Sequence, residues 1–585
     1  MIFFRFQKVH MMKKRTLSLT AAVLALLLLC ACAAEPPRGA DGNVPYFGDM
    51  EYARPDPAAL EACVASVEGA LDAGEAAEDV TALLDECYAE YYSFSTMYTL
   101  AEIRYMQDMA DEYYAQEYAW CAENYAGVQQ LMERLYISCA SSDEAQELEE
   151  LYFWEGFAGE YGGEDASRYS DEAVALMQRE NELVSEYYAL TNAPQIELDG
   201  ETVDYGEYTA QAEGYDYSRA VMEYYRQYNA RFAELYIELV KVRRALAAEM
   251  GYESYEQMQY ESFERDYGPQ EAADYIAAIK AELVPLYASV MAQEPYSAVE
   301  YVYMTEARLM DTVGAAAEEI GGDAAEAFEF MRGHGLYDAA QSGSKASMSF
   351  TTYLENYDAP FLFIDPYCDT EDVLTLSHEF GHYLDAYVNY NAYESLDLSE
   401  CFSQAMEYIM LDRCAMQDGD EQAALQLIKL LDTLDLYVTQ ASFAEFESRV
   451  YAMDEDELDA DALNMLSLEL AGEFGYLGAN EEYYALSWID VTHFFEAPFY
   501  VISYPVANDA AMQIYALERE SAGTGLEKYT EMLPRGHNGL IETLEAAGLE
   551  SPFAPGRVEA AAALMREELA QAGFTVDDEY DEYAA

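Results

Sequence analysis

Apolar residues recur along most of this chain at spacings of three and four positions, which is the pattern of amphipathic helices. The pattern is almost continuous over residues 58–335, in segments rich in Ala, Glu, Leu, Met and Tyr, and helices are predicted again after residue 391 to about residue 570. Two short runs differ: residues 347–353 and 361–364 are β-prone. The pattern therefore predicts a mainly helical fold with one small β-sheet.

Length and charge narrow the class of protein. A chain of 585 residues exceeds one comfortable hydrophobic core, so two or more lobes are expected. Its 112 acidic and 30 basic side chains give a formal net charge of −82. Such a charge repels phosphate backbones, so nucleic acid is excluded as a partner, whereas cationic peptides would be attracted. Acidic residues are spread evenly, however, which is typical of a solvated surface.

The chain begins with a targeting segment, predicted over residues 1–34. A basic stretch at Lys13 is followed by an apolar run over residues 17–29 and then by Leu-Cys-Ala-Cys ending at Cys32. This ending resembles the bacterial lipobox, which implies cleavage before Cys32 and an acyl anchor on it. The expected location is the extracellular face of a bacterial membrane, with Cys32 as the sole membrane contact. The alternative is a plain cleaved signal peptide and a secreted protein.

Four further regions are predicted by composition. Residues 35–57 are rich in Pro and Gly and are interpreted as a tether. Residues 58–205 are predicted to form an N-terminal helical lobe, and residues 206–570 a catalytic region. Residues 571–585 are predicted to be a disordered acidic tail.

The candidate chemistry lies in His378-Glu379-Phe380-Gly381-His382. On a helix, histidines four residues apart share a face, so both imidazoles can bind one zinc ion, and the adjacent Glu379 can accept a proton from water. Gly381 is unfavourable inside a helix unless another element, such as a second ligand helix, approaches closely there. Asp369 or Thr370 is the predicted N-cap. The alternative interpretation is an ordinary amphipathic helix with two surface histidines.

A catalytic zinc site needs a third protein ligand. On a second helix Glu400, Gln404 and Glu407 would share a face, so one carboxylate could bind the metal. Residues 372–382 followed by this segment resemble the oligoendopeptidase F and thimet oligopeptidase family of zinc metallopeptidases. The resemblance implies that Glu400 is the third ligand, with Glu407 as the alternative. Asp385 stands where the family's motif usually continues with a further histidine.

A later block, residues 493–504, extends the resemblance, which covers roughly residues 200–565. It implies that His493 contacts substrate and that Tyr500 or Tyr504 stabilises the oxyanion, although Ile502 replaces an intervening tyrosine. The alternative is aromatic helix packing with one structural histidine. The family implies a mainly α, two-lobed helical ellipsoid with a deep substrate channel, and the small β-sheet is expected beside the zinc site.

These features predict a monomeric zinc metalloendopeptidase that hydrolyses internal bonds of short unfolded peptides. It would carry one Zn²⁺ on His378, His382 and Glu400, with Glu379 as the base. Three alternatives stay open. They are a zinc carboxypeptidase on a similar helical frame, a catalytically silent surface peptide-binding lipoprotein and a structural helical surface lipoprotein.

Overall fold

A computed structural model describes residues 44–154, 156–162, 170–191, 194–209, 211–212, 214–391, 395–534 and 539–576. The predicted signal peptide, the Cys32 anchor, the tether up to residue 43 and the acidic tail from residue 577 lie outside the described residues. Within the described part, no helix is both long and apolar enough to span a membrane.

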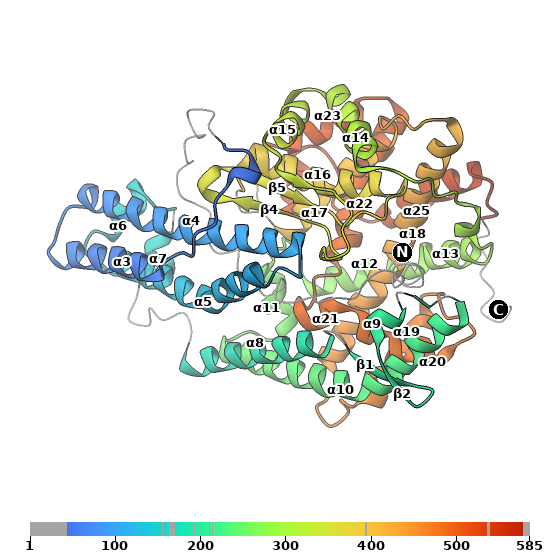
Figure 1. The fold of residues 1–585 in the computed structure, drawn as a ribbon, viewed down its shortest axis with the longest axis horizontal. Helices are drawn as coiled ribbons and strands as arrows, with labels where there is room; N and C mark the ends of the chain where they lie inside the picture. Colours follow the sequence, from blue (N-terminus) through green and yellow to red (C-terminus); the bar gives the residue numbers. More distant parts are fainter. Residues whose placement is uncertain are drawn as a thin grey trace.

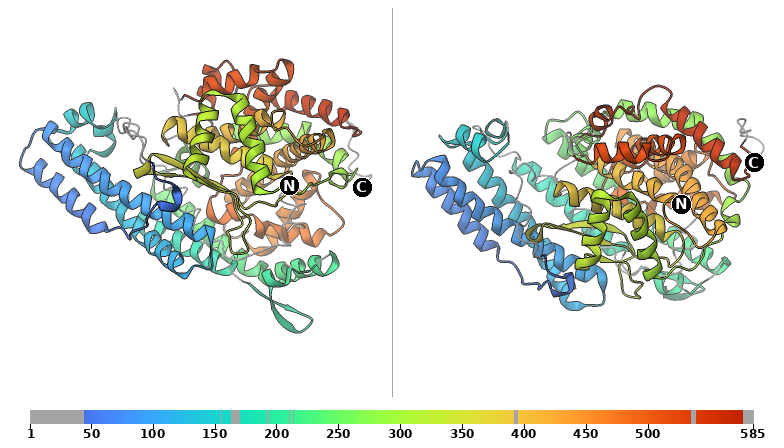
Figure 2. Two further views of the ribbon diagram at one scale, coloured as in Figure 1. Left: turned by 45° about the horizontal axis from the view of Figure 1, so that its top comes forward. Right: turned by 90° about the horizontal axis from the view of Figure 1, so that it is seen from above.

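The N-terminal helices form an elongated arm at one end of the molecule (Figures 1 and 2). Three long helices of this arm pack on one another through buried leucine, valine and tyrosine side chains. The arm consists of α3 (Pro57–Asp72), α4 (Ala77–Gln107), α5 (Glu112–Ala140), α6 (Ala145–Leu151) and α7 (Phe157–Tyr161), preceded by the 3₁₀ helix η2 (Phe47–Asp49).

The lower half of the view in Figure 1 is built around α10 (Gly214–Glu249), which packs along α8 (Asp171–Thr191). The other elements of this half are β1 (Gln195–Leu198), β2 (Glu201–Asp204), α9 (Tyr205–Thr209), α11 (Tyr255–Ser262), α19 (Ala460–Glu473), α20 (Glu481–Leu486), η5 (Ser487–Asp490) and α21 (Thr492–Glu496). Since α8 packs on α10, the helices before and after the predicted domain boundary at residue 205 share contacts.

The upper half contains the second sheet and the helices that follow it. Its elements are α14 (Glu306–Ile320), α15 (Gly322–His334), β3 (Tyr337–Asp338), β4 (Phe350–Leu354), η4 (Glu355–Tyr357), β5 (Ala359–Phe363), α16 (Asp372–Asn389), α17 (Leu396–Leu411), α22 (Ser503–Glu520), α23 (Thr524–Met532), α24 (Leu540–Ala546) and α25 (Arg557–Gln571). The remaining elements, several of which contact helices of this half, are α12 (Pro269–Glu282), α13 (Val284–Met291), η3 (Pro295–Ala298) and α18 (Gly419–Ala452).

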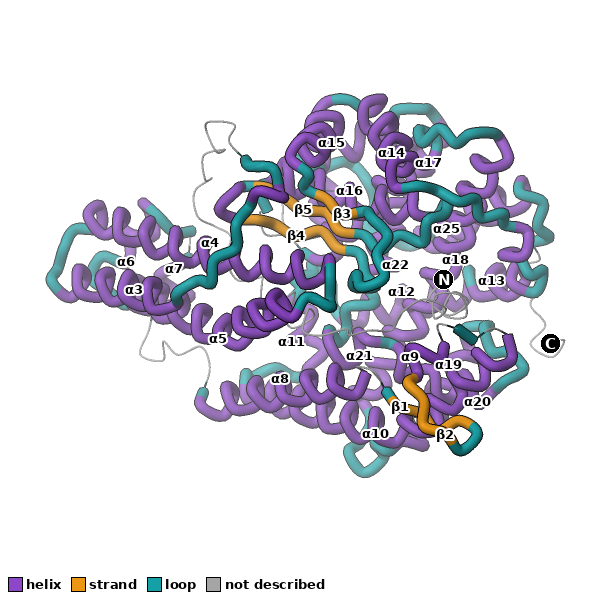
Figure 3. The backbone as a smooth tube through the Cα atoms, viewed as in Figure 1, coloured by secondary structure: helices purple, strands orange, loops and turns teal. Residues whose placement is uncertain are grey.

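The predicted mainly helical fold with a small sheet beside the histidine motif is confirmed (Figure 3). The sheet has the order β3-β5-β4, with β4 antiparallel and β3 parallel to the buried central strand β5. Strand β4 is therefore an edge strand, and both β4 and β5 contact α16. The predicted substrate channel and the predicted domain limits stay predictions.

One element of the fold was not expected. Residues 195–204, predicted as part of the helical region, form an antiparallel hairpin instead. Its turn is Asp199-Gly200, with φ of 57° and 83°. A two-residue hairpin turn requires positive φ at both positions, and Asp-Gly is among the pairs that adopt it most readily. The dipeptide is the sequence signal for this hairpin, between alternating residues such as Ile196 and Leu198.

Candidate metal centre and active site

The two helices that carry the predicted metal ligands, α16 and α17, are in direct backbone contact at Gly381. A Cβ atom placed on Gly381 would lie 2.5 Å from the Cα of Ser403 and 2.7 Å from the carbonyl oxygen of Phe402. The prediction that another element approaches this turn closely is confirmed, and that element is the helix of Glu400. Glycine is required here because the helices cross without room for a side chain.

The predicted N-cap of α16 was wrong. The helix begins at Asp372 with Glu371 in the capping position, and Glu371 makes no side-chain cap. Instead the Asp372 carboxylate accepts hydrogen bonds from the backbone N–H groups of Tyr367 and Asp369, at 2.8 and 3.2 Å. The carboxylate thereby holds the loop that leads from the sheet into the motif helix.

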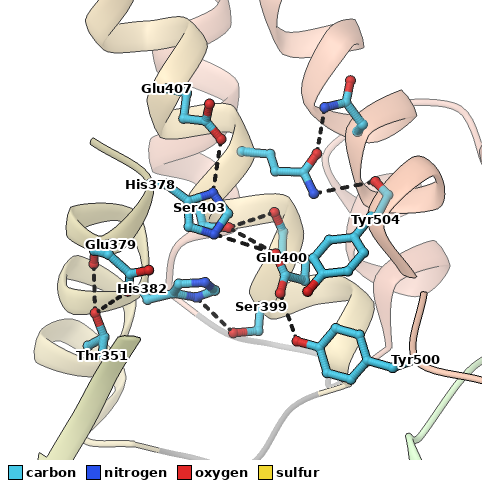
Figure 4. Close-up of polar contacts among 12 residues, drawn as sticks. Thr351, His378, Glu379, His382, Ser399, Glu400, Ser403, Glu407, Tyr500 and Tyr504 are labelled. Atoms are coloured by element: carbon cyan, nitrogen blue, oxygen red, sulfur yellow. Dashed lines mark hydrogen bonds and ion pairs between the residues drawn. The ribbon is translucent and has the colours of Figure 1, made fainter. Parts of the chain in front are cut away.

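Three side chains converge where α16 and α17 cross (Figure 4). One ligand atom each of His378, His382 and Glu400 lies within 4.8 Å of the others, and this is the only such metal-binding cluster among the described residues. Nε2 of His378 is 3.7 Å from Oε2 of Glu400. Two imidazoles and one carboxylate form a donor set typical of catalytic zinc sites. The interpretation of two unrelated surface histidines does not account for this convergence.

The remaining ring nitrogens are held by hydrogen bonds from the opposite side. Nδ1 of His378 lies 2.9 Å from Oε1 of Glu407, and Nδ1 of His382 lies 3.1 Å from Oγ of Ser399. These contacts fix the ring orientations, and Nε2 of His378 faces Glu400. Glu407, the alternative third ligand, therefore lies behind the His378 ring and outside the cluster of converging ligand atoms.

Glu407 is itself fixed by a buried cation. Lys429 Nζ donates to its Oε2 at 2.9 Å, and the lysine side chain is 5% exposed. Burial raises the pKa of Glu407, but Lys429 and His378 together outweigh this effect and hold the pKa below its ordinary value. Burial acts to lower the pKa of His378. The hydrogen bond and the charge of Glu407 outweigh this effect and raise the pKa to about 9. The pair thus keeps a proton on Nδ1 of His378.

Glu379 points from α16 toward the sheet (Figure 4). The hydroxyl oxygen of Thr351 on the edge strand β4 lies 3.0 Å from both the backbone oxygen and Oε2 of Glu379. Burial is the main cause that raises the pKa of Glu379 to about 7. A carboxyl group with a pKa near neutrality is suited to accept and return a proton at working pH.

The residues of the later block, 493–504, lie on the other side of Glu400. Tyr500 donates its hydroxyl to Oε1 of Glu400 at 2.9 Å, and the Tyr504 hydroxyl is 3.4 Å from Nε2 of His493. The rings of Tyr500 and Tyr504 have centroids 5.3 Å apart. Burial lowers the pKa of His493 to about 4, so its imidazole is neutral at neutral pH. Ile502, which replaces the family's intervening tyrosine, is buried.

Three contacts of the site were not indicated by the sequence: Thr351 on Glu379, Ser399 on His382 and Lys429 on Glu407. Ser399 precedes Glu400, so its position beside the predicted ligand was the available signal. Thr351 and Lys429 lie on β4 and α18, and no spacing relates them to the motif. Asp385, the departure from the family motif, is buried and accepts a hydrogen bond from Asn389 at 2.8 Å.

Comparison with known proteins agrees with this geometry. The model of the peptidase M3 N-terminal domain matches residues 47–158, and the model of peptidase family M3 matches residues 327–561. Oligopeptidase PepF of Bacillus subtilis (strain 168) is 24% identical over 223 residues, which cover 36% of this chain but only 33% of that relative.

Solved structures share the fold. PZ peptidase A, determined with an inhibitor, superposes with a TM-score of 0.76 at 24% identity and covers 91% of this chain and 100% of its own. Oligoendopeptidase-F from Enterococcus faecium superposes with a TM-score of 0.59 at 17% identity, covering 88% of this chain and 97% of its own. The two domain models together span most of the described chain and include the whole ligand cluster, and on this evidence the chain belongs to peptidase family M3.

Proposed function

We propose that this protein is a zinc metalloendopeptidase that hydrolyses internal bonds of short unfolded peptides. The observation that carries the proposal is the convergence of His378, His382 and Glu400, with Glu379 next to the first of them. Membership of a peptidase family supports peptide bonds as the target, and the names of the relatives, an oligopeptidase and an oligoendopeptidase, favour short peptides and internal cleavage.

The donor set fits zinc on chemical grounds. Imidazole nitrogen and carboxylate oxygen are common zinc ligands, and three protein ligands leave a coordination position for water or substrate. The carboxylate of Glu407 selects the tautomer of His378 in which Nε2 can donate its lone pair, and Ser399 holds the ring of His382 in place. Zinc bound by His378, His382 and Glu400 would supply Lewis acidity, which polarises a carbonyl group and acidifies water.

The side chains around this centre would transfer the proton, bind the peptide and stabilise the oxyanion. Glu379 would accept a proton from the attacking water and deliver it to the departing amine. Thr351 holds the Glu379 carboxylate beside β4. Because β4 is an edge strand, an extended peptide would bind by adding to it as a further strand. His493 and Tyr504, whose polar atoms face each other, would donate hydrogen bonds to the oxyanion.

A zinc carboxypeptidase is the second candidate, since it would use the same ligands and base. A catalytically silent peptide-binding protein would not require the ligands and Glu379 together. We further propose that the protein is anchored through Cys32 to the extracellular face of a bacterial membrane, on the strength of the lipobox-like sequence.

The decisive experiment measures zinc content and cleavage of internally quenched peptides by the mature protein and by Glu379→Gln. Glu326→Gln serves as the control because it removes an exposed carboxylate from α15, the helix packed on α16. We expect one zinc per chain in all three proteins and loss of cleavage in Glu379→Gln alone, by a factor of about 10²–10⁴. Cleavage of a peptide blocked at its C-terminus separates an endopeptidase from a carboxypeptidase. Absence of zinc from the purified wild type would refute the proposed metal centre.

A further inference from the structure

The residue directly before Tyr500 has an unusual backbone. Phe499 has φ of +63°, in the left-handed region, and its side chain is 2% exposed. Bulky residues rarely adopt this conformation because Cβ crowds the following carbonyl oxygen, and it persists only where the surroundings enforce it. The direction in which the Tyr500 side chain points depends on this backbone conformation of Phe499.

Two buried ionisable side chains hold both polar groups of Phe499. Oε1 of Glu447 accepts its backbone N–H at 2.9 Å, and Nη2 of Arg265 donates to its carbonyl oxygen at 2.8 Å. Glu447 is 0% exposed, and so is the side chain of Arg265. A hydrogen bond from the ionised guanidinium is stronger than a neutral one, and burial strengthens both bonds further. These two bonds account for the left-handed conformation.

The same guanidinium reaches the helix of the third ligand. Nε of Arg265 lies 3.4 Å from Oδ2 of Asp397, which is in the first turn of α17, three residues before Glu400. Nη2 also donates to Oγ of Ser503 at 2.7 Å, at the start of α22. Arg265 therefore joins the start of α17 to the segment that carries Tyr500, and Tyr500 in turn donates to Glu400.

We propose that Arg265 and Glu447 are positioning residues, which hold Phe499 in its left-handed conformation and thereby place the Tyr500 hydroxyl on Oε1 of Glu400. This inference rests on the proposed function of the site as a zinc centre. With Oε1 held by Tyr500, Oε2 is the carboxylate oxygen that faces Nε2 of His378. Arg265 and Glu447 together are called the clamp. The clamp orients Glu400, the third ligand, without touching it, through the backbone of Phe499.

Lysine is not expected to replace Arg265. Nη2 donates to Phe499 and Ser503 on the segment that carries Tyr500, whereas Nε is paired with Asp397 on α17. A single ammonium group lacks the planar geometry to reach both segments in this way. For Glu447 the requirement is weaker, because an amide oxygen can still accept the Phe499 N–H. The clamp therefore predicts that Glu447→Gln is tolerated and that Glu447→Leu is not.

The test is a double-mutant cycle on zinc affinity, measured by competition with a chelator, for Arg265→Gln, Tyr500→Phe and the double variant. Loss of a group that orients a metal ligand lowers metal affinity about 10- to 100-fold. We expect each single variant to lose about 10-fold and the double variant no more than either. Losses that multiply in the double variant would show that Arg265 does not act through Tyr500, and would overturn the proposal.

Arg413→Gln is the matched control. Arg413 also donates to a backbone carbonyl and pairs with a carboxylate, Glu518, but it lies beyond the opposite end of α17. Its substitution should change stability and leave zinc affinity unaltered. If Arg265→Gln fails to fold, the Glu447→Gln and Glu447→Leu pair decides instead, with a loss of about 10-fold expected only in the leucine variant. Equal affinities in the two variants would refute the clamp.

The outcome is independent of peptide cleavage. A wild type that binds zinc without cleaving peptides would refute the proposed endopeptidase, yet the affinity cycle would still test the clamp. In an active enzyme, Arg265→Gln should lower kcat more than it changes KM, because the peptide-binding edge of β4 is untouched. A change confined to KM would contradict the assignment.

Discussion

The close crossing of α16 and α17 gives a direct test of how tightly the metal ligands are set. We consider Gly381→Ala, which adds one methyl group between the two histidines. The new Cβ would lie 2.5 Å from the Cα of Ser403, whereas ordinary contact begins at 3.4 Å, so the helices must separate by about 3.4 − 2.5 = 0.9 Å. Both nearest atoms belong to backbone, so no side-chain rotation can relieve the clash.

Two opposing effects determine the stability change. Alanine in place of glycine favours the helix by about 1 kcal/mol, whereas overpacking in a close-packed interior is unfavourable by about 1–3 kcal/mol. We therefore expect a net loss of up to about 2 kcal/mol in the free energy of unfolding. The effect on zinc should be larger, since ligand distances in metal sites are set within about 0.2 Å. A displacement of 0.9 Å between the helices exceeds that tolerance several-fold.

The measurements are the urea midpoint and the zinc affinity of wild type, Gly381→Ala and the control Gly69→Ala. Gly69 lies on an exposed face of α3, where an added Cβ meets nothing within 4 Å. The control should gain up to about 1 kcal/mol and keep its zinc affinity, because only helix propensity changes. If Gly381→Ala behaved like Gly69→Ala in both assays, the helices would be free to separate and the rigid-crossing argument would be refuted.

Three further predictions concern the Lys429–Glu407 pair, the pH dependence of stability and the lipid anchor. Glu407→Gln should lower zinc affinity about 10- to 100-fold, as seen by chelator competition, because a neutral amide oxygen accepts the His378 N–H more weakly than a carboxylate and Lys429 stays buried without a counter-charge; unchanged affinity would contradict this role. Burial raises the pKa of Glu447 and of Glu496 to about 8, above their ordinary value of 4.5, so the stability they contribute is complete below pH 4.5 and is lost as the pH rises through 8. The urea midpoint should therefore fall between pH 5.5 and pH 9, and a rising midpoint would refute the sign. Cys32→Ser should release the protein from the membrane fraction of its host, whereas wild type should remain bound; equal fractionation would exclude the lipid anchor.

The parts of the fold and site that follow local periodicity could be predicted. Helical spacing over long segments gave the fold class, and the four-residue spacing of the histidines placed them on one face of α16. Gly381 even indicated the neighbouring helix, because an internal glycine is unfavourable without a close contact. The hairpin at residues 195–204 was hidden among helical segments, although its Asp-Gly turn carries a recognisable signal.

The parts that depend on contacts between distant segments could not be predicted. Lys429 reaches Glu407 from α18, and Thr351 reaches Glu379 from a strand 28 residues earlier in the chain. Arg265 contacts Phe499 across 234 positions of sequence. Such pairs have no fixed spacing, because the loops between them can vary in length without moving the contact. A charged side chain such as Lys429 or Arg265 is recognised as part of the site only once the structure shows that it is buried.

The difference between local helix contacts and contacts from distant segments has a physical consequence for the site. The ligands lie on two helices whose own hydrogen bonds are local, so the spacing of the histidines within α16 does not depend on how the two helices pack. The relative placement of the ligands depends on three separate restraints: the glycine crossing, the Lys429–Glu407 pair behind His378, and the Tyr500 hydroxyl on Glu400. Each restraint comes from a different region of the chain. Since these regions need not loosen together, a variant that weakens one restraint should lower zinc affinity at denaturant concentrations where helix content is still that of the wild type.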